Sequence, residues 1–187
     1  MSADGLHWIA LHAHVGKHED GLLRDVVAPL LAAVPVAPER FFFLRYWSGG
    51  PHLRLRFLCA PDAAPALRAA FAARFAAWAA TVGDWGDTPH LDDSARLASL
   101  EGAGVEAWIT PPALLDAPYA PELGKYGGPQ GVRTAERLWA ASTQLALAAN
   151  ARGMLQGTAR LTAEASTWRW SACAPSAWSW KRPSPGS

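Results

Sequence analysis

The sequence predicts an α+β domain, in which an antiparallel β-sheet with a central hairpin packs against several α-helices. Two strand-like segments, 41–47 and 52–59, flank a turn sequence at 48–51 and predict the hairpin. Half of the 187 residues are hydrophobic, which is enough for one core. Apolar residues also recur at helical spacing in three segments, which are 19–33, 61–82 and 130–150.

The chain opens with an expected strand at 6–15. Leu6, Trp8 and Ala10 alternate with residues that are also partly apolar, so both faces of this strand can be buried. A helix is expected next, at 19–33. Pro29 lies inside it and predicts a kink or a break, because proline lacks the backbone N–H and its ring clashes with the preceding turn.

The alanine-rich helix at 61–82 has one stripe of large apolar residues, which are Leu67, Phe71, Phe75 and Trp78. Residues three or four apart share one face of a helix, so this stripe is expected to contact the core.

The second half of the chain is less regular. Between 83 and 128 the pattern weakens and acidic residues accumulate, with a short strand expected at 105–110. The helix at 130–150 is well defined, and a shorter one is expected at 158–165. We therefore expect a single domain at 1–166 and an irregular, tryptophan-rich tail at 167–187. One hypothesis for the change is that the sequence after about Ser166 is out of register with its ancestral gene, or that the protein is a shortened paralogue.

Composition excludes several classes of protein. A formal net charge of +1 argues against general binding to nucleic acid, which needs a strongly basic surface. Cys59 and Cys173 have no paired spacing, so a disulfide framework or zinc site is not expected, and a reducing, cytoplasmic location is. The N-terminus does not resemble a signal peptide, and no apolar run is long enough to cross a membrane.

The hairpin carries the main chemical expectation. With a four-residue loop at 48–51, Arg45 lies opposite Arg54. Side chains alternate between the two faces of a strand. One face then collects mainly apolar residues, namely Phe42, Leu44, Tyr46, Leu53, Leu55 and Phe57. The other face collects Phe43, Arg45, Trp47, His52, Arg54 and Arg56.

Arginines that face one another across a strand pair are destabilising unless an anion lies between them. Guanidinium groups bind carboxylate or phosphate through two parallel hydrogen bonds, so the second face is interpreted as a pocket for an anionic group. Two alternatives stay open. The face can be exposed to solvent, or its arginines can pair with the acidic stretch at 84–106 or with Glu122.

These residues also carry a resemblance. The segment 41–56, FFFLRYWSGGPHLRLR, resembles the signature of the thiopeptide-type bacteriocin biosynthesis domain, which is also the C-terminal elimination domain of class I lantibiotic dehydratases. The segments LHWIALHA at 6–13 and YAPELGKYGG at 119–128 resemble further motifs of the same family, as does the following helix with Glu136, Trp139 and Ser142. The likeness covers about residues 6–150.

The resemblance implies work on a ribosomally made, post-translationally modified peptide. Lantibiotic elimination domains remove glutamate from glutamylated Ser or Thr and leave a dehydroamino acid, which is lyase-type chemistry. Related thiopeptide enzymes join two dehydroalanines in a formal four-plus-two cycloaddition. The third alternative is a non-catalytic module that binds the precursor peptide. No cofactor or metal is implied. The expected partners are the precursor peptide and a separate glutamylating protein, and a homodimer is a further alternative.

On the elimination hypothesis, Arg45, Arg54 and Arg56 stabilise the departing carboxylate and His52 is the nearest candidate base. His12, expected on a neighbouring strand, joins a substrate-binding set completed by Tyr46, Trp47, Glu122 and Tyr126. His12, His14 and His18 do not form a convincing metal site, because no carboxylate or cysteine completes a ligand set. The family also uses a later histidine, and this chain has none after His90.

Overall fold

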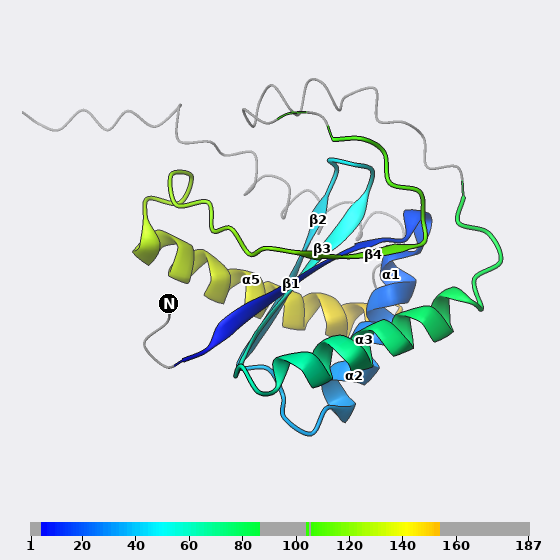
Figure 1. Ribbon diagram of the computed structural model, residues 1–187, viewed down its shortest axis with the longest axis horizontal. Coiled ribbons are helices and arrows are strands. Elements are labelled where there is room, and N and C mark those ends of the chain that lie inside the picture. The colour runs from blue at the N-terminus through cyan, green and yellow to red at the C-terminus, as the bar shows by residue number, and fades with distance from the viewer. Residues whose placement is uncertain (1–4, 87–103, 105, 154–187) are drawn as a thin grey trace, which may run out of the picture.

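The computed structural model describes residues 5–86, 104 and 106–153, and it has the α+β architecture that the sequence predicts (Figure 1). Four strands form one antiparallel sheet in the order β2-β3-β1-β4. Their bounds are β1 His7–His14, β2 Arg40–Tyr46, β3 His52–Cys59 and β4 Ala113–Ala117. The strands expected at 6–15, 41–47 and 52–59 are all present, and the hairpin β2–β3 lies beside the N-terminal strand β1.

One face of the sheet is covered by helices. The helical run after β1 and the helix α3 (Ala64–Ala79) pack on inward-facing residues of β1 and β3, such as Ile9, Leu55 and Phe57, which are at most 1% exposed. The predicted stripe of α3 is confirmed, because Leu67, Phe71 and Phe75 are buried and Trp78 packs against the same cluster. The opposite face of the sheet carries the polar residues described below.

The helical run predicted at 19–33 is present, and its irregularity lies close to Pro29. It consists of α1 (Glu19–Leu22), a π-helical turn η2 (Leu23–Val27) and α2 (Ala28–Ala33), and a short 3-10 turn η1 (Gly16–His18) precedes it. Proline cannot donate the usual backbone hydrogen bond, and a wider turn before it removes the need for one. The prediction of a local distortion is thereby confirmed.

The long helix α5 (Pro129–Ala151) covers the outer edge of β2. The backbone N–H of Phe43 donates to the Thr143 hydroxyl at 3.2 Å, and Thr143 is only 3% exposed. This contact pairs a backbone group that would otherwise be unsatisfied at a sheet edge.

Replacing Thr143 with valine is therefore expected to lower the free energy of unfolding by about 1–3 kcal/mol, because the shape is kept and the Phe43 N–H loses its partner. Urea denaturation measures the change. Thr134→Val is the matched control, since the Thr134 hydroxyl donates only to the Gln130 carbonyl within its own helix and is exposed. Equal stability of the two variants would contradict the role given to Thr143.

Two expectations about the second half need comment. The strand expected at 105–110 is wrong, because residues 106–110 form no regular element and the strand is β4, at 113–117. Ala-Leu-Leu-Asp-Ala has little strand propensity, and its extended conformation comes from pairing with β1. The expected helix at 158–165 and the tail at 167–187 lie outside the described residues. Within the described part of the chain, no helix is long and apolar enough to cross a membrane.

Candidate functional site

The register of the hairpin differs from the predicted register by one residue, and this shift decides which side chains share a face. Tyr46 lies opposite His52, Arg45 opposite Leu53 and Leu44 opposite Arg54. The predicted register, with Arg45 opposite Arg54, is therefore wrong. Trp47 has left the ladder, because its carbonyl accepts from Gly50 N–H at 3.0 Å and the loop has five residues instead of four.

Gly49 and Gly50 make this longer loop possible. Their φ angles are +74° and +97°, values that side-chain-bearing residues rarely adopt. A register shift of one residue moves every side chain of a strand to the other face. Arg45 consequently points to the helical side of the sheet, away from Arg54 and Arg56.

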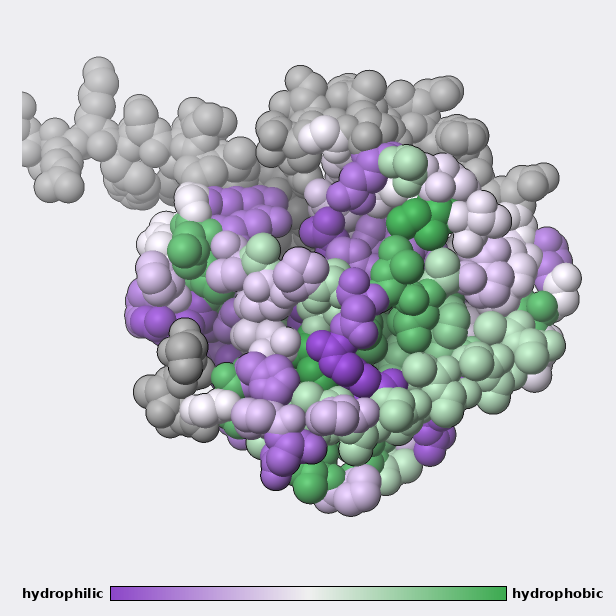
Figure 2. Space-filling view, viewed as in Figure 1, coloured by the Kyte–Doolittle hydropathy of each residue, from purple (hydrophilic) through white to green (hydrophobic). Residues whose placement is uncertain are grey.

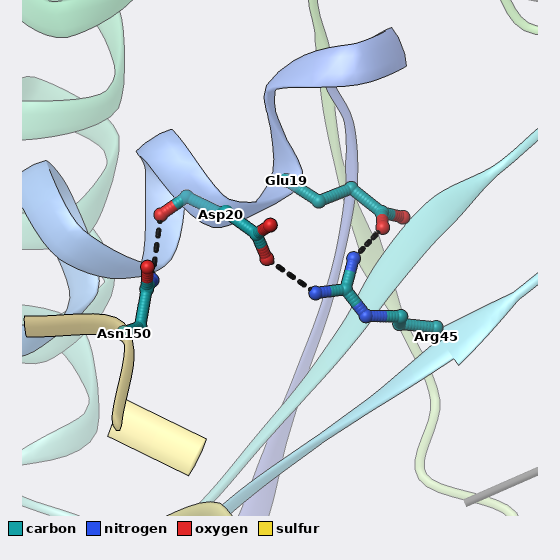
Figure 3. A network of polar contacts seen from close by, with 4 residues as sticks. All are labelled: Glu19, Asp20, Arg45 and Asn150. Atoms are coloured by element: carbon teal, nitrogen blue, oxygen red, sulfur yellow. Dashed lines mark hydrogen bonds and ion pairs between the residues drawn. The ribbon is translucent and has the colours of Figure 1, made fainter. Parts of the chain in front are cut away.

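On the helical side, Arg45 forms a largely buried ion-pair network with Glu19 and Asp20 of α1 (Figure 3). One terminal nitrogen reaches the Glu19 carboxylate and the other lies 2.5 Å from Asp20 Oδ1. Asn150, at the end of α5, donates to the Asp20 carbonyl at 2.8 Å. These contacts join β2 to two helices, so Arg45 does not share a face with Arg54 and Arg56 as the predicted register required.

The opposite face brings together three histidines and two arginines, which we call the histidine–arginine face. Its members are His12 and His14 of β1 and His52, Arg54 and Arg56 of β3. The expectation that His12 lies on a strand next to the hairpin is confirmed, because His12 is directly opposite Arg54.

The three imidazole rings form a stack. The ring centroid of His52 lies 5.0 Å from that of His12 and 4.2 Å from that of His14. Burial lowers the pKa of His52 to about 3; the hydrogen bond with the Gly50 carbonyl opposes this shift, and His14, His12 and Arg54 add to it. Burial, Arg56 and Arg54 lower the pKa of His12 to about 3, and burial also lowers the pKa of His14. The rings of His12 and His52 are therefore neutral at pH 7.

The hydrogen bonds identify the tautomers of two of these rings. Arg56 Nη2 lies 3.0 Å from His12 Nε2, and a guanidinium can only donate, so His12 Nε2 is the acceptor. His52 Nδ1 lies 2.9 Å from the Gly50 carbonyl and must therefore carry the proton. The lone pair of neutral His52 is left on Nε2, which is buried and has no hydrogen-bond partner within the described ranges.

Neither arginine of this face is paired with a carboxylate in the described part of the chain. The Arg54 guanidinium carbon lies 3.2 Å from the centre of the Tyr46 ring, a cation–π contact, and its Nε is buried without a partner. Arg56 is 7% exposed, and burial together with Arg54 lowers its pKa to about 10, so it stays charged at pH 7. Among the described residues the face therefore holds two cations without a carboxylate partner, and such cations favour an anion beside them.

An aromatic wall borders Arg56. The Trp8 ring contacts those of Phe42 and Tyr119, at centroid distances of 5.2 and 5.1 Å, and the Tyr119 ring lies 5.9 Å from the Arg56 guanidinium carbon. The Tyr119 hydroxyl donates to the buried Glu136 carboxylate at 2.5 Å. Burial, followed by the Glu136 contact, raises the pKa of Tyr119 well above its usual value. Tyr119 is thus a neutral, fixed group at pH 7.

The family model described as "Lantibiotic biosynthesis dehydratase C-term" matches residues 8–176. The chain belongs to this family. None of the curated proteins matches the sequence at a significant level.

Solved structures show the same fold. The pyridine synthase TbtD from thiomuracin biosynthesis is 24% identical with a TM-score of 0.63, and the match covers 81% of this chain and 50% of that one. The tRNA-dependent lantibiotic dehydratase MibB from Microbispora sp. 107891 is 23% identical with a TM-score of 0.55, and the match covers 84% of this chain and 13% of MibB. TsrL is 28% identical with a TM-score of 0.50, and the match covers 83% of this chain and 37% of TsrL. The chain thus spans half or less of each of these proteins.

Within this lantibiotic dehydratase C-terminal fold, the other expected binding residues are scattered. Tyr46 lies against Arg54, whereas the predicted register had placed the two on opposite faces of the hairpin. Trp47 is buried at 3% exposure, and its indole N–H has no hydrogen-bond partner among the described residues. Glu122 pairs with Lys125 at 3.2 Å, so the expected alternative of a pair between Glu122 and the hairpin arginines is not what the structure shows. Tyr126, just before α5, packs edge-on against Trp139 within that helix, and their ring centroids are 5.2 Å apart.

Sequence reasoning missed four residues of this region, namely Trp8, His14, Tyr119 and Glu136, as members of the site. The alternation in β1 placed Trp8, His12 and His14 on one face, but only the order of strands shows that this face adjoins β3. Tyr119 and Glu136 are 17 positions apart in a loop and a helix, and no spacing rule joins them.

Proposed function

We propose that this chain acts on a modified precursor peptide during the maturation of a ribosomally made peptide, and that its reaction is glutamate elimination. The observation that carries the proposal is the pair Arg54 and Arg56, charged and without a carboxylate partner in the described residues, next to neutral histidines. Residues two apart on a strand are about 7 Å apart on the same face, which lets both guanidinium groups reach one carboxylate.

Elimination develops negative charge where these cations lie. The α-proton of a glutamylated Ser or Thr passes to a base, and its C–H electron pair becomes the new double bond. The bond between the β-carbon and the ester oxygen breaks, and glutamate leaves with that oxygen as a carboxylate. Preorganised cations in a site with little water stabilise such charge most effectively.

A neutral imidazole can take the proton. His52 Nε2 carries an unpartnered lone pair, and the Nδ1 contact with Gly50 holds the ring in that tautomer. Its pKa of about 3, set mainly by burial, makes it a weak base. An anion bound to Arg54 and Arg56 offsets their charge, which raises the pKa of His12 and, to a smaller extent, that of His52.

The partners implied by this chemistry are a precursor peptide and a protein that glutamylates it. The matched structures are two or more times longer than the matched part, so a second protein or further chain can supply groups that this part lacks.

Cycloaddition is the second candidate. Trp8 and Tyr119, the partly exposed members of the aromatic wall, give a flat, unsaturated substrate a surface to stack on beside Arg56, and the similar pyridine synthase TbtD supports this alternative. A substrate with two dehydroalanines, and not a glutamylated one, would then be consumed.

The experiment gives the protein two synthetic peptides, one with a glutamylated serine and one with two dehydroalanines, and follows products by mass spectrometry. Elimination predicts release of glutamate from the first peptide, and Arg54→Gln or Arg56→Gln is expected to slow it by about a hundredfold or more. Arg133→Gln is the control, since Arg133 is exposed on α5 and contacts only Gln130 among the described residues.

Other results lead to other conclusions. Turnover of the second peptide alone favours cycloaddition, and binding without turnover of either favours a non-catalytic module. Full glutamate release by both arginine variants would refute the role of this face.

A further inference from the structure

His12 lies at the centre of the histidine–arginine face, on a strand that is paired along both edges. β1 pairs with β3 on one side and with β4 on the other, so the backbone of His12 is held in place. Its ring centroid is 5.0 Å from that of His52, and it lies directly opposite Arg54. Figure 2 shows a mostly hydrophobic surface over α3 and more hydrophilic surface on the other side of the sheet, where this face lies.

The hydrogen bond with Arg56 decides which atom of His12 is left for a substrate. A neutral imidazole has one lone pair and one N–H. The lone pair of His12 is on Nε2, which accepts from Arg56 Nη2 at 3.0 Å, so the proton is on Nδ1. No described residue accepts a hydrogen bond from Nδ1, and the side chain is partly exposed. His12 therefore offers a substrate an oriented N–H donor, whereas its basic nitrogen is occupied.

The charge state of His12 suits a donor of this kind. Burial, followed by Arg56 and Arg54, lowers the pKa of His12 to about 3, so the ring is neutral at pH 7. A neutral imidazole N–H can stabilise an oxygen that gains negative charge during a reaction, and it does so best when it is already oriented in a site with little water. His12 is therefore equipped to stabilise an oxyanion and not to remove a proton.

We propose that His12 is a catalytic residue, whose Nδ1–H donates to the carbonyl oxygen of the Ser or Thr residue that loses glutamate. The inference rests on the proposed function, because that reaction requires the α-proton to leave. When the base takes this proton, the C–H electron pair forms a double bond to the carbonyl carbon, and the carbonyl π electrons move to the oxygen. The resulting enolate then re-forms the carbonyl, the double bond moves to the α- and β-carbons, and the bond from the β-carbon to the ester oxygen breaks.

The spacing of the groups matches one residue of a substrate. A carbonyl oxygen is about 2.4 Å from the α-carbon of its own residue, as the bond lengths require. The base, the carbonyl donor and the cations for the leaving carboxylate must therefore be close neighbours. His52, His12 and Arg54 meet this requirement, since they occupy adjacent positions on two paired strands. Proton removal, enolate stabilisation and binding of the leaving group are thus assigned to different side chains.

Two variants separate the Nδ1 donor from the Nε2 acceptor. The amide group of asparagine is attached at Cγ, like Nδ1 of histidine, whereas that of glutamine is one carbon farther out, at the level of Nε2. His12→Gln can still accept from Arg56 but loses the Nδ1 donor, and it is expected to lower kcat for glutamate release about a hundredfold with little change in KM. His12→Asn keeps a donor at that place and is expected to stay within about tenfold of the wild type.

The control is His7→Gln, because His7 is on the same strand but alternates to the other face, and its kcat is expected to be unchanged. A purely structural role for the contact between His12 and Arg56 predicts the reverse order, since it is the asparagine variant that removes this contact. An asparagine variant less active than the glutamine variant would therefore overturn the proposal.

Exchange of the α-proton in deuterium oxide measures enolate formation without elimination. The probe is a peptide in which glutamate is joined to 2,3-diaminopropionate, so that an amide, which is a poor leaving group, replaces the ester. The whole protein is expected to introduce deuterium at this α-carbon, as followed by mass spectrometry. His12→Gln is expected to slow the exchange about a hundredfold, in proportion to its effect on glutamate release. Equal exchange by the two proteins would contradict the role of His12.

The inference and the proposed function can fail separately. Exchange that depends on His12, without glutamate release from the ester peptide, refutes elimination and supports the enolate-stabilising role. Glutamate release that His12→Gln leaves unchanged refutes that role and supports elimination, and the lack of both exchange and release refutes both. Nitrogen-15 NMR of the free protein tests the tautomer by itself, because a proton on Nε2 of His12 in place of Nδ1 would overturn the inference whatever the activity.

Discussion

Replacing Arg45 with methionine is expected to lower the free energy of unfolding by about 3–5 kcal/mol, the range for breaking a buried ion pair from one side. The Arg45 side chain is 14% exposed and its partner Glu19 is 11% exposed. Removing the guanidinium leaves the carboxylates of Glu19 and Asp20 close together and poorly hydrated (Figure 3). Urea denaturation at neutral pH measures the loss.

The control for Arg45 is an ion pair of the same protein that is exposed to solvent. Lys17 and Asp84 are 2.6 Å apart, but their side chains are 55% and 75% exposed, so Lys17→Met is expected to cost about 1 kcal/mol or less. If the Arg45→Met variant had normal stability but released no glutamate, Arg45 would act in the reaction, and its structural role would be contradicted.

The second large effect is acid instability of the histidine stack. Burial lowers the pKa of His52 from 6.5 to about 3 in the folded protein, whereas the unfolded chain keeps an ordinary histidine. Below pH 6.5 the unfolded state therefore binds the proton more readily, and stability is lost as the pH falls from 6.5 toward 3. At pH 5 the loss is about 2 kcal/mol for His52 alone, at 1.36 kcal/mol for each unit of pH.

His12 adds to this loss in the same direction, since its pKa is also lowered, but it is partly exposed and contributes less. Denaturation curves at pH 7 and pH 5 measure the difference. His52→Gln is expected to reduce the dependence on pH, while His7→Gln, which removes a histidine outside the stack, is expected to leave it unchanged. A wild-type protein that is equally stable at both values would contradict the neutral, buried stack.

The link between acid instability and the proposed reaction is the charge beside the stack. Burial is the main cause of the low pKa of His12 and His52; Arg56 and Arg54 lower that of His12 further, and Arg54 makes a small contribution at His52. A bound carboxylate would offset those charges, and glutamate would then protect the protein against acid more than chloride does. The same two arginines are therefore expected to affect both the pH dependence of stability and the rate of the proposed reaction.

Much of the molecule could be predicted because its signals are local. The strands at 6–15, 41–47 and 52–59, the apolar stripe of α3 and the position of α5 follow from the period of apolar residues. The distortion near Pro29 follows from the missing N–H of proline. Membership of the family followed from ordered motifs in the sequence and agrees with the matched residues 8–176.

Tertiary structure alone decided which residues of the hairpin act together. Phe41 to Tyr46 is apolar at both alternations apart from Arg45, so its pattern cannot choose a face, and a loop longer by one residue moved Arg45 to the helices. The strand at 113–117 has no strand-forming composition and exists because β1 offers it a partner. Apart from this strand, the type of each element depends on neighbours along the chain, whereas register, strand order and the pairing of charges depend on contacts between distant segments, which no local period encodes.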